Sequence, residues 1–70
     1  MNKYSEKLQE TIKENNSNYI TYSQLALILN IDILTLQNNI KKHINKLDIK
    51  GYSIEKDPKD LRRKIIKLEF

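Results

Sequence analysis

The sequence predicts an α+β fold in which three helices and a short strand precede a small antiparallel β-hairpin. The expected order is helix, strand, helix, helix, strand, strand. Apolar residues recur every three or four positions up to about residue 50, and roughly every second position after it. The first spacing is typical of amphipathic helices and the second of half-buried strands. With 70 residues, the chain is expected to form one domain over 1–70.

The first helix is expected over residues 3–15, where Tyr4, Leu8 and Ile12 are spaced by four. A run of asparagine and serine follows and ends it, because short polar side chains compete for backbone hydrogen bonds. The next residues, 19–21, are aromatic and β-branched, which predicts a short strand or an extended entry to the following helix.

A second helix is expected over residues 22–29. Thr21 and Gln24 have the spacing of a capping box, in which the hydroxyl accepts from an amide three residues on and the glutamine side chain reaches back. Ser23 is an alternative cap. The helix has little polar surface, so we expect it to be nearly enclosed.

The third helix is expected to be long. Asn30 tolerates the left-handed conformation that ends a helix, and Asp32 can cap the next one. Apolar residues then follow at helical spacing: Leu36, Ile40, Ile44 and Leu47. Gly51, the only glycine, stands where a left-handed residue would end this helix.

The outer face of this long helix combines amides and lysines. A side-chain amide can make two hydrogen bonds to adenine, and lysine can reach phosphates or guanine. An ordinary solvated helix in a chain rich in Asn and Lys accounts equally well for this face taken alone. The candidate recognition residues are Asn38, Lys41, Lys42 and Asn45, with Thr35 and Gln37 at the near end.

Two alternating segments, 52–56 and 64–70, predict the strands of the hairpin, with proline and aspartate at turn positions between them. Its long tip is basic. Several cations near one turn repel one another and contribute nothing to a core, so they favour binding to phosphates or a groove over a solvated turn. These residues are Lys56, Lys59, Arg62, Arg63 and Lys64.

The charge is concentrated in one half of the chain. The total is +4, but residues 1–32 carry three lysines and four acidic residues, whereas residues 33–70 carry ten Lys and Arg and five acidic residues. Such polarity points to a polyanionic partner. A composition set by an AT-rich genome would also raise the Lys and Asn content.

Residues from about 20 to 68 resemble winged helix-turn-helix DNA-binding domains. The segment 40–47, followed by Gly51, looks like the recognition helix of the biotin-repressor type. The segment Asp60-Leu61-Arg62, followed by Ile66 and Leu68, is similar to the wing of the multiple-antibiotic-resistance regulator (MarR) family. The resemblance implies that Arg62 enters a minor groove and that Asp60 orients it, and the negative potential of a narrow A·T groove attracts arginine.

Two departures limit what the resemblance implies. The third helix is expected to be one turn longer than the usual short form. MarR proteins also dimerise through terminal helices outside this core, so only the first helix is available here for such an interface. Family ligand pockets lie near that interface, and no small-molecule ligand is therefore expected.

Other classes of function find little support. Without Cys, the chain can form neither disulfides nor thiolate metal sites, and His43, the only histidine, is expected to pack at the edge of the apolar stripe. Asp57 and Asp60 are explained as a turn cap and an arginine partner rather than as catalytic acids. We expect no enzyme, metal or cofactor. No apolar run approaches the roughly 20 residues of a membrane span, and no signal-peptide core is present, so a cytoplasmic protein is expected.

The sequence thus favours a protein that binds double-stranded, A·T-rich DNA, with the third helix in the major groove and the wing on the minor groove. It would regulate transcription, or recognise a plasmid or phage site, as a dimer or as adjacent copies. One alternative is a protein-contact module using outward Leu34 and Ile49. Another is single-stranded DNA binding through Tyr4, Tyr19, Tyr22 and Tyr52, although core roles explain these rings better.

Overall fold

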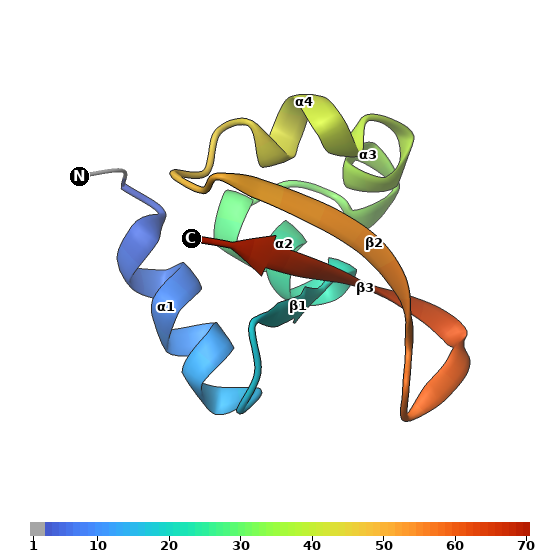
Figure 1. The fold of residues 1–70 in the computed structure, drawn as a ribbon. Coiled ribbons are helices and arrows are strands. Elements are labelled where there is room, and N and C mark those ends of the chain that lie inside the picture. The colour runs from blue at the N-terminus through green and yellow to red at the C-terminus, as the bar shows by residue number, and fades with distance from the viewer. Residues whose placement is uncertain (1–2) are drawn as a thin grey trace.

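The computed structural model describes residues 3–70 and confirms the α+β class (Figure 1). Over these residues it has four helices and one three-stranded antiparallel sheet. In chain order the elements are α1 (Ser5–Glu14), β1 (Tyr19–Thr21), α2 (Tyr22–Leu29), α3 (Ile33–Asn38), α4 (Ile40–Ile44), β2 (Gly51–Asp57) and β3 (Asp60–Glu69). None of the helices in this part of the chain has the length and apolar character needed to cross a membrane.

The core lies between the sheet and the helices. The strand order is β1-β3-β2, so β3 is central, and Ile66 lies between Ile20 on one side and Ile54 on the other. Ile66 and Ile20 have no exposed surface, and the helices bring further fully buried or nearly buried side chains against them. Each helix contributes at least one: Leu8 and Ile12 from α1, Leu25, Ala26 and Leu29 from α2, Leu36 from α3, and Ile44 from α4.

A polar cluster fixes the junction of α1, β1 and α2. The predicted capping box is present: Gln24 N donates to Thr21 Oγ1 at 3.1 Å, and Thr21 N donates to Gln24 Oε1 at 3.1 Å. The side chain of Asn15 extends it, donating to Gln24 Oε1 at 2.9 Å and to the Tyr19 carbonyl at 3.0 Å. Gln24 Nε2 donates back to Asn15 Oδ1.

Replacing Gln24 by alanine is expected to lower the free energy of unfolding by about 1–2 kcal/mol, because the Thr21 amide and the Asn15 side chain lose partners at a partly buried site. Thermal unfolding followed by circular dichroism measures this loss. Gln9→Ala on the exposed surface of α1 is the matched control. If the two variants unfold together, the cluster does not stabilise the junction.

The expected long helix is wrong, because Asn39 breaks it. Asn39 has φ −150° and ψ 55°, outside the helical range, and separates α3 from α4. Residues 37–39 all have amide side chains, and the last of them is the break itself. An asparagine side chain can form hydrogen bonds with nearby backbone groups, which would otherwise bond within the helix. Gly51 is not a left-handed cap either: it begins β2, and its φ is not positive.

The turn between α2 and α3 agrees with the expectation. Asn30 adopts the left-handed conformation at φ 56°, and Asp32 Oδ2 accepts from the Leu34 amide at 3.0 Å. The enclosure expected for α2 is wrong, however, because Leu27 on its outer face is 81% exposed. Ile49 is also not outward: it packs partly against the core.

Candidate nucleic-acid interface

The end of the hairpin is shorter and less regular than expected. Only Pro58 and Lys59 lie between β2 and β3, so the expected long loop is wrong and most of its basic residues belong to β3. The register changes abruptly here: Lys56 pairs with Lys64, but the next residue, Asp57, pairs with Asp60. The three residues 61–63 of β3 therefore form a bulge between consecutive residues of β2. Figure 1 shows this end of the hairpin projecting from the body of the molecule.

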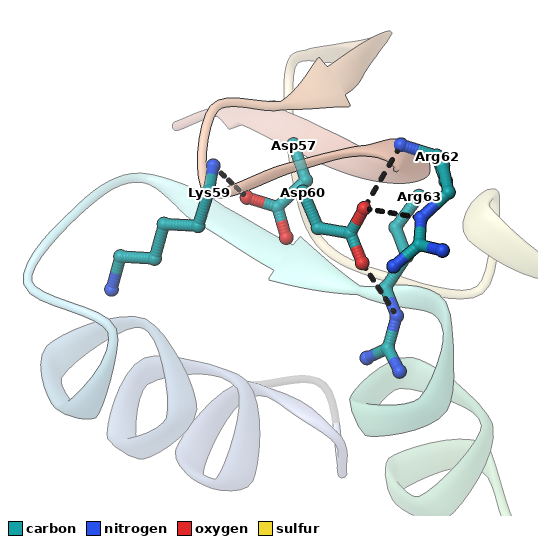
Figure 2. Close-up of polar contacts among 5 residues, drawn as sticks. All are labelled: Asp57, Lys59, Asp60, Arg62 and Arg63. Carbon is teal, nitrogen blue, oxygen red and sulfur yellow. Dashed lines mark hydrogen bonds and ion pairs between the residues drawn. The ribbon is translucent and has the colours of Figure 1, made fainter.

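The carboxylate of Asp60 holds the bulge (Figure 2). Its Oδ1 accepts from Arg62 N at 3.1 Å and from Arg62 Nε at 3.2 Å, and its Oδ2 lies 3.7 Å from Arg63 Nε. Neighbouring side chains of a regular strand point to opposite faces, so the bulge is what lets both arginines reach one carboxylate.

These ion pairs orient the arginines more than they stabilise the fold. The side chains of Arg62 and Arg63 are 92% and 79% exposed, whereas that of Asp60 is 32% exposed. Pairs exposed to this degree contribute only about 0–1 kcal/mol to folding. A similar local bond shapes the turn, where Asp57 Oδ1 accepts from Lys59 N at 2.9 Å. The sequence resemblance implied contact between Asp60 and Arg62, and the structure places them in contact.

Positive charge is concentrated at this end of the hairpin at a cost to the sheet. Five cations and two carboxylates lie between Lys56 and Lys64. Lys56 and Lys64 are direct cross-strand partners, and like charges in this arrangement destabilise a sheet. Nearer the core the pairing is instead complementary, with Lys67 Nζ 3.8 Å from Glu55 Oε1. The like-charged pair of Lys56 and Lys64 therefore does not stabilise the hairpin.

A hollow of about 700 Å³ lies between the hairpin and the helices. Thr21, the last residue of β1, pairs with Ile65, so α2 begins beside the part of β3 that contains Lys64. One wall is formed by hairpin residues and the other by the start of α2 and by residues of α3. The lining residues are Asp57, Arg62, Arg63 and Lys64, opposite Thr21, Tyr22, Ser23, Ile33 and Gln37.

The structure brings together only part of the residue set expected from the sequence. Gln37 shares the hollow with Arg62, Arg63 and Lys64. The other expected residues are exposed but lie outside it, on α3, on or directly after α4, or on the hairpin: Thr35, Asn38, Lys41, Lys42, Asn45, Lys56 and Lys59. The long helix was expected to present one continuous face, and the break at Asn39 divides that face between α3 and α4.

Sequence reasoning missed the contribution of α2 to this hollow. Ser23 is exposed at the first turn of α2, and Thr21 and Tyr22 flank it. A signal was present: because Thr21 forms the cap, the hydroxyl of Ser23 is not needed for capping. Its position opposite the arginines depends on strand pairing across 44 residues of sequence, from Thr21 to Ile65.

His43 packs inside the protein, as expected. It is 8% exposed, and its Nδ1 has no hydrogen-bond partner. Burial lowers the pKa of His43 below its ordinary value of 6.5, and the charges of Lys46 and Lys42 lower it further. Over residues 3–70 no group of three or more His, Cys, Asp or Glu could hold a metal ion.

Stability is expected to fall as the pH is lowered from 7 through 6.5, with His43 as a cause. In the unfolded chain the imidazole binds a proton near pH 6.5, but in the folded protein its pKa is lower. Between these two values the unfolded state binds more protons, so protonation favours unfolding. Urea unfolding midpoints at pH 7.5 and 5.5 measure the effect, which His43→Leu should reduce. An equal pH dependence in the variant would show that His43 is not responsible.

The geometry thus consists of a projecting basic hairpin, a carboxylate that holds two arginines, and a hollow shared with the starts of α2 and α3. The arrangement offers cations and hydrogen-bond donors to an extended anion. Comparisons of the chain with protein-family models, with curated proteins and with solved structures found no match.

Proposed function

We propose that this chain is a winged helix-turn-helix protein that binds double-stranded DNA. In this proposal α2 and α3 form the helix-turn-helix, and the hairpin of β2 and β3 is the wing. The hollow is the observation that carries the proposal. With α3 in the major groove and the wing at the adjacent minor groove, the sugar-phosphate backbone that separates the grooves would lie in the hollow.

The arrangement of elements supports this assignment. The left-handed Asn30 and the Asp32 cap make a tight turn between α2 and α3, as a helix-turn-helix requires. Residues of the hairpin line the same hollow as residues of these two helices.

The exposed amides of α3 are suited to the major groove. Gln37 and Asn38 can each make paired hydrogen bonds to adenine, and Thr35 can contact a thymine methyl group. The exposed Lys41, Lys42 and Asn45 on or after α4 are assigned to neighbouring phosphates, which position the protein without reading sequence. The base contacts proposed for α3 favour an A·T-rich site.

The wing supplies most of the electrostatic attraction. Lys56, Lys59 and Lys64 neutralise phosphates, while Arg62 and Arg63 are held by Asp60 for the minor groove. A narrow A·T groove has the negative potential that attracts arginine. We propose a cytoplasmic role in transcriptional regulation or in site recognition on a plasmid or phage. Because a single module buries only about 600–1,000 Å², dimers or adjacent copies would bind paired sites.

Fluorescence anisotropy with A·T-rich and G·C-rich duplexes, repeated over a range of salt concentrations, tests the proposal. If four or five phosphates are neutralised, the logarithm of the binding constant should fall with the logarithm of salt concentration with a slope of about −4. The A·T-rich duplex should bind more tightly. A protein that binds no duplex at about 50 mM salt, where such contacts are strong, does not have the proposed function.

A second function, protein contact, is favoured by one observation. Leu27 on α2 and Leu34 on α3 are 81% and 63% exposed, so neither contributes to the core and both are available for contact with a partner. Replacing both by lysine would abolish binding to a protein partner. Single-stranded DNA binding has no such support, because all four tyrosines are partly buried and Tyr4, Tyr22 and Tyr52 pack against the core.

A further inference from the structure

Leu61 is an apolar side chain placed among charges. It is 70% exposed and lies in the hairpin bulge, directly between Asp60 and Arg62. A single exposed leucine is common on protein surfaces and needs no explanation by itself. Here the position is unusual because the bulge takes residues 61–63 out of the strand pairing and the Asp60 carboxylate then fixes the backbone beside Leu61.

We propose that Leu61 is a wedge that enters the minor groove beside Arg62, partly unstacks one base step and bends the duplex. This inference rests on the proposed DNA-binding function. Proteins that bend DNA from the minor groove insert apolar side chains such as leucine between base pairs, and flank them with cations that hold the backbone. The bulge supplies both kinds of group within three consecutive residues, Leu61, Arg62 and Arg63.

The charges around Leu61 match this role. The side chains of Arg62 and Arg63 are 92% and 79% exposed, and both contact the Asp60 carboxylate (Figure 2). The opposed Lys56 and Lys64 stand at the base of the bulge, where the hairpin would meet the phosphates of the two strands. Their repulsion is relieved when a polyanion lies between or beside them.

A bend also follows from the size of the groove. The minor groove of straight B-DNA is only about 6 Å wide, too narrow for a two-stranded ribbon with long side chains. Arginine side chains alone can enter a narrow groove. Entry of the hairpin end together with Leu61 requires the groove to open, and unstacking at Leu61 opens it by bending the DNA toward the major groove. Flexible pyrimidine–purine steps such as TA are deformed most easily, so the wedge would select one at this position.

The test uses the full chain and an A·T-rich duplex of about 30 base pairs with a central TA step, a length over which bending is measurable. Anisotropy reports binding, energy transfer between dyes at the two ends reports bending, and 2-aminopurine at the central step reports unstacking. On binding of the wild-type protein, energy transfer and 2-aminopurine fluorescence should both rise, with a bend of about 20–90°.

Leu61→Ala should lose most of both signals while its affinity stays within about tenfold of wild type. Leu61→Met should keep them, and Leu27→Ala, a change of equal size at an exposed site on α2, should not alter them. If the wild-type protein binds without bending, or Leu61→Ala bends DNA as wild type does, the wedge is wrong and the DNA-binding function stands. If no duplex is bound, both proposals fail.

Discussion

Replacing Arg62 and Arg63 together by alanine is expected to weaken duplex binding by at least roughly 30-fold, because each groove-reading arginine contributes about 1–3 kcal/mol. Both side chains are highly exposed and absent from the core, so the fold should be intact. The preference for the A·T-rich duplex should also weaken, whereas the salt dependence, which the phosphate-binding lysines set, should change less. Anisotropy titrations at several salt concentrations measure both effects.

Two controls separate groove recognition from total charge. Lys7→Ala with Lys13→Ala removes the same charge from the exposed surface of α1, and should weaken binding far less. Asp60→Ala is more discriminating. It removes a negative charge, so a purely electrostatic attraction predicts tighter binding, whereas loss of the contacts to Arg62 and Arg63 predicts weaker binding. Tighter binding by Asp60→Ala would contradict the orienting role of this carboxylate.

Replacing Ile66 by alanine is expected to have the largest effect on stability. Ile66 is fully buried on the central strand, paired with Ile20 and Ile54. Truncating such a side chain costs about 2–5 kcal/mol, and 70 residues are expected to supply only about 4–10 kcal/mol in total. A loss of 3 kcal/mol would lower Tm by about 12–24 °C.

Ile54→Ala is the matched control for this prediction. It makes the same chemical change at the cross-strand partner of Ile66, where the side chain is already 37% exposed. Thermal unfolding should show a much smaller loss for Ile54→Ala. Equal losses would mean that burial against the helices is not what makes Ile66 important.

Local chemistry made much of the fold predictable. The capping box of Thr21 and Gln24, the left-handed Asn30 and the Asp32 cap each depend on a few neighbouring residues, and all are present. The break at Asn39 was not predictable from apolar spacing, because Leu36, Ile44 and their neighbours still reach the core on either side of it.

The candidate site was predictable only in part. Exposure and charge follow from composition and pattern, and the basic residues of the hairpin are exposed as expected. Their arrangement depends on strand register, which apolar alternation does not reveal at a charged hairpin end. The bulge at 61–63 and the position of Ser23 opposite Arg63 both come from pairing between distant segments.

The most direct test is a nuclear magnetic resonance titration of the isotope-labelled protein with an A·T-rich duplex. It shows whether residues of the hollow and of the hairpin contact the same DNA backbone. Amide signals of Ser23, Gln37, Arg62 and Lys64 should move together, and those of the exposed face of α1 should stay in place. Movement confined to α1 or to Leu27, or no movement at all, would contradict the proposed mode of binding.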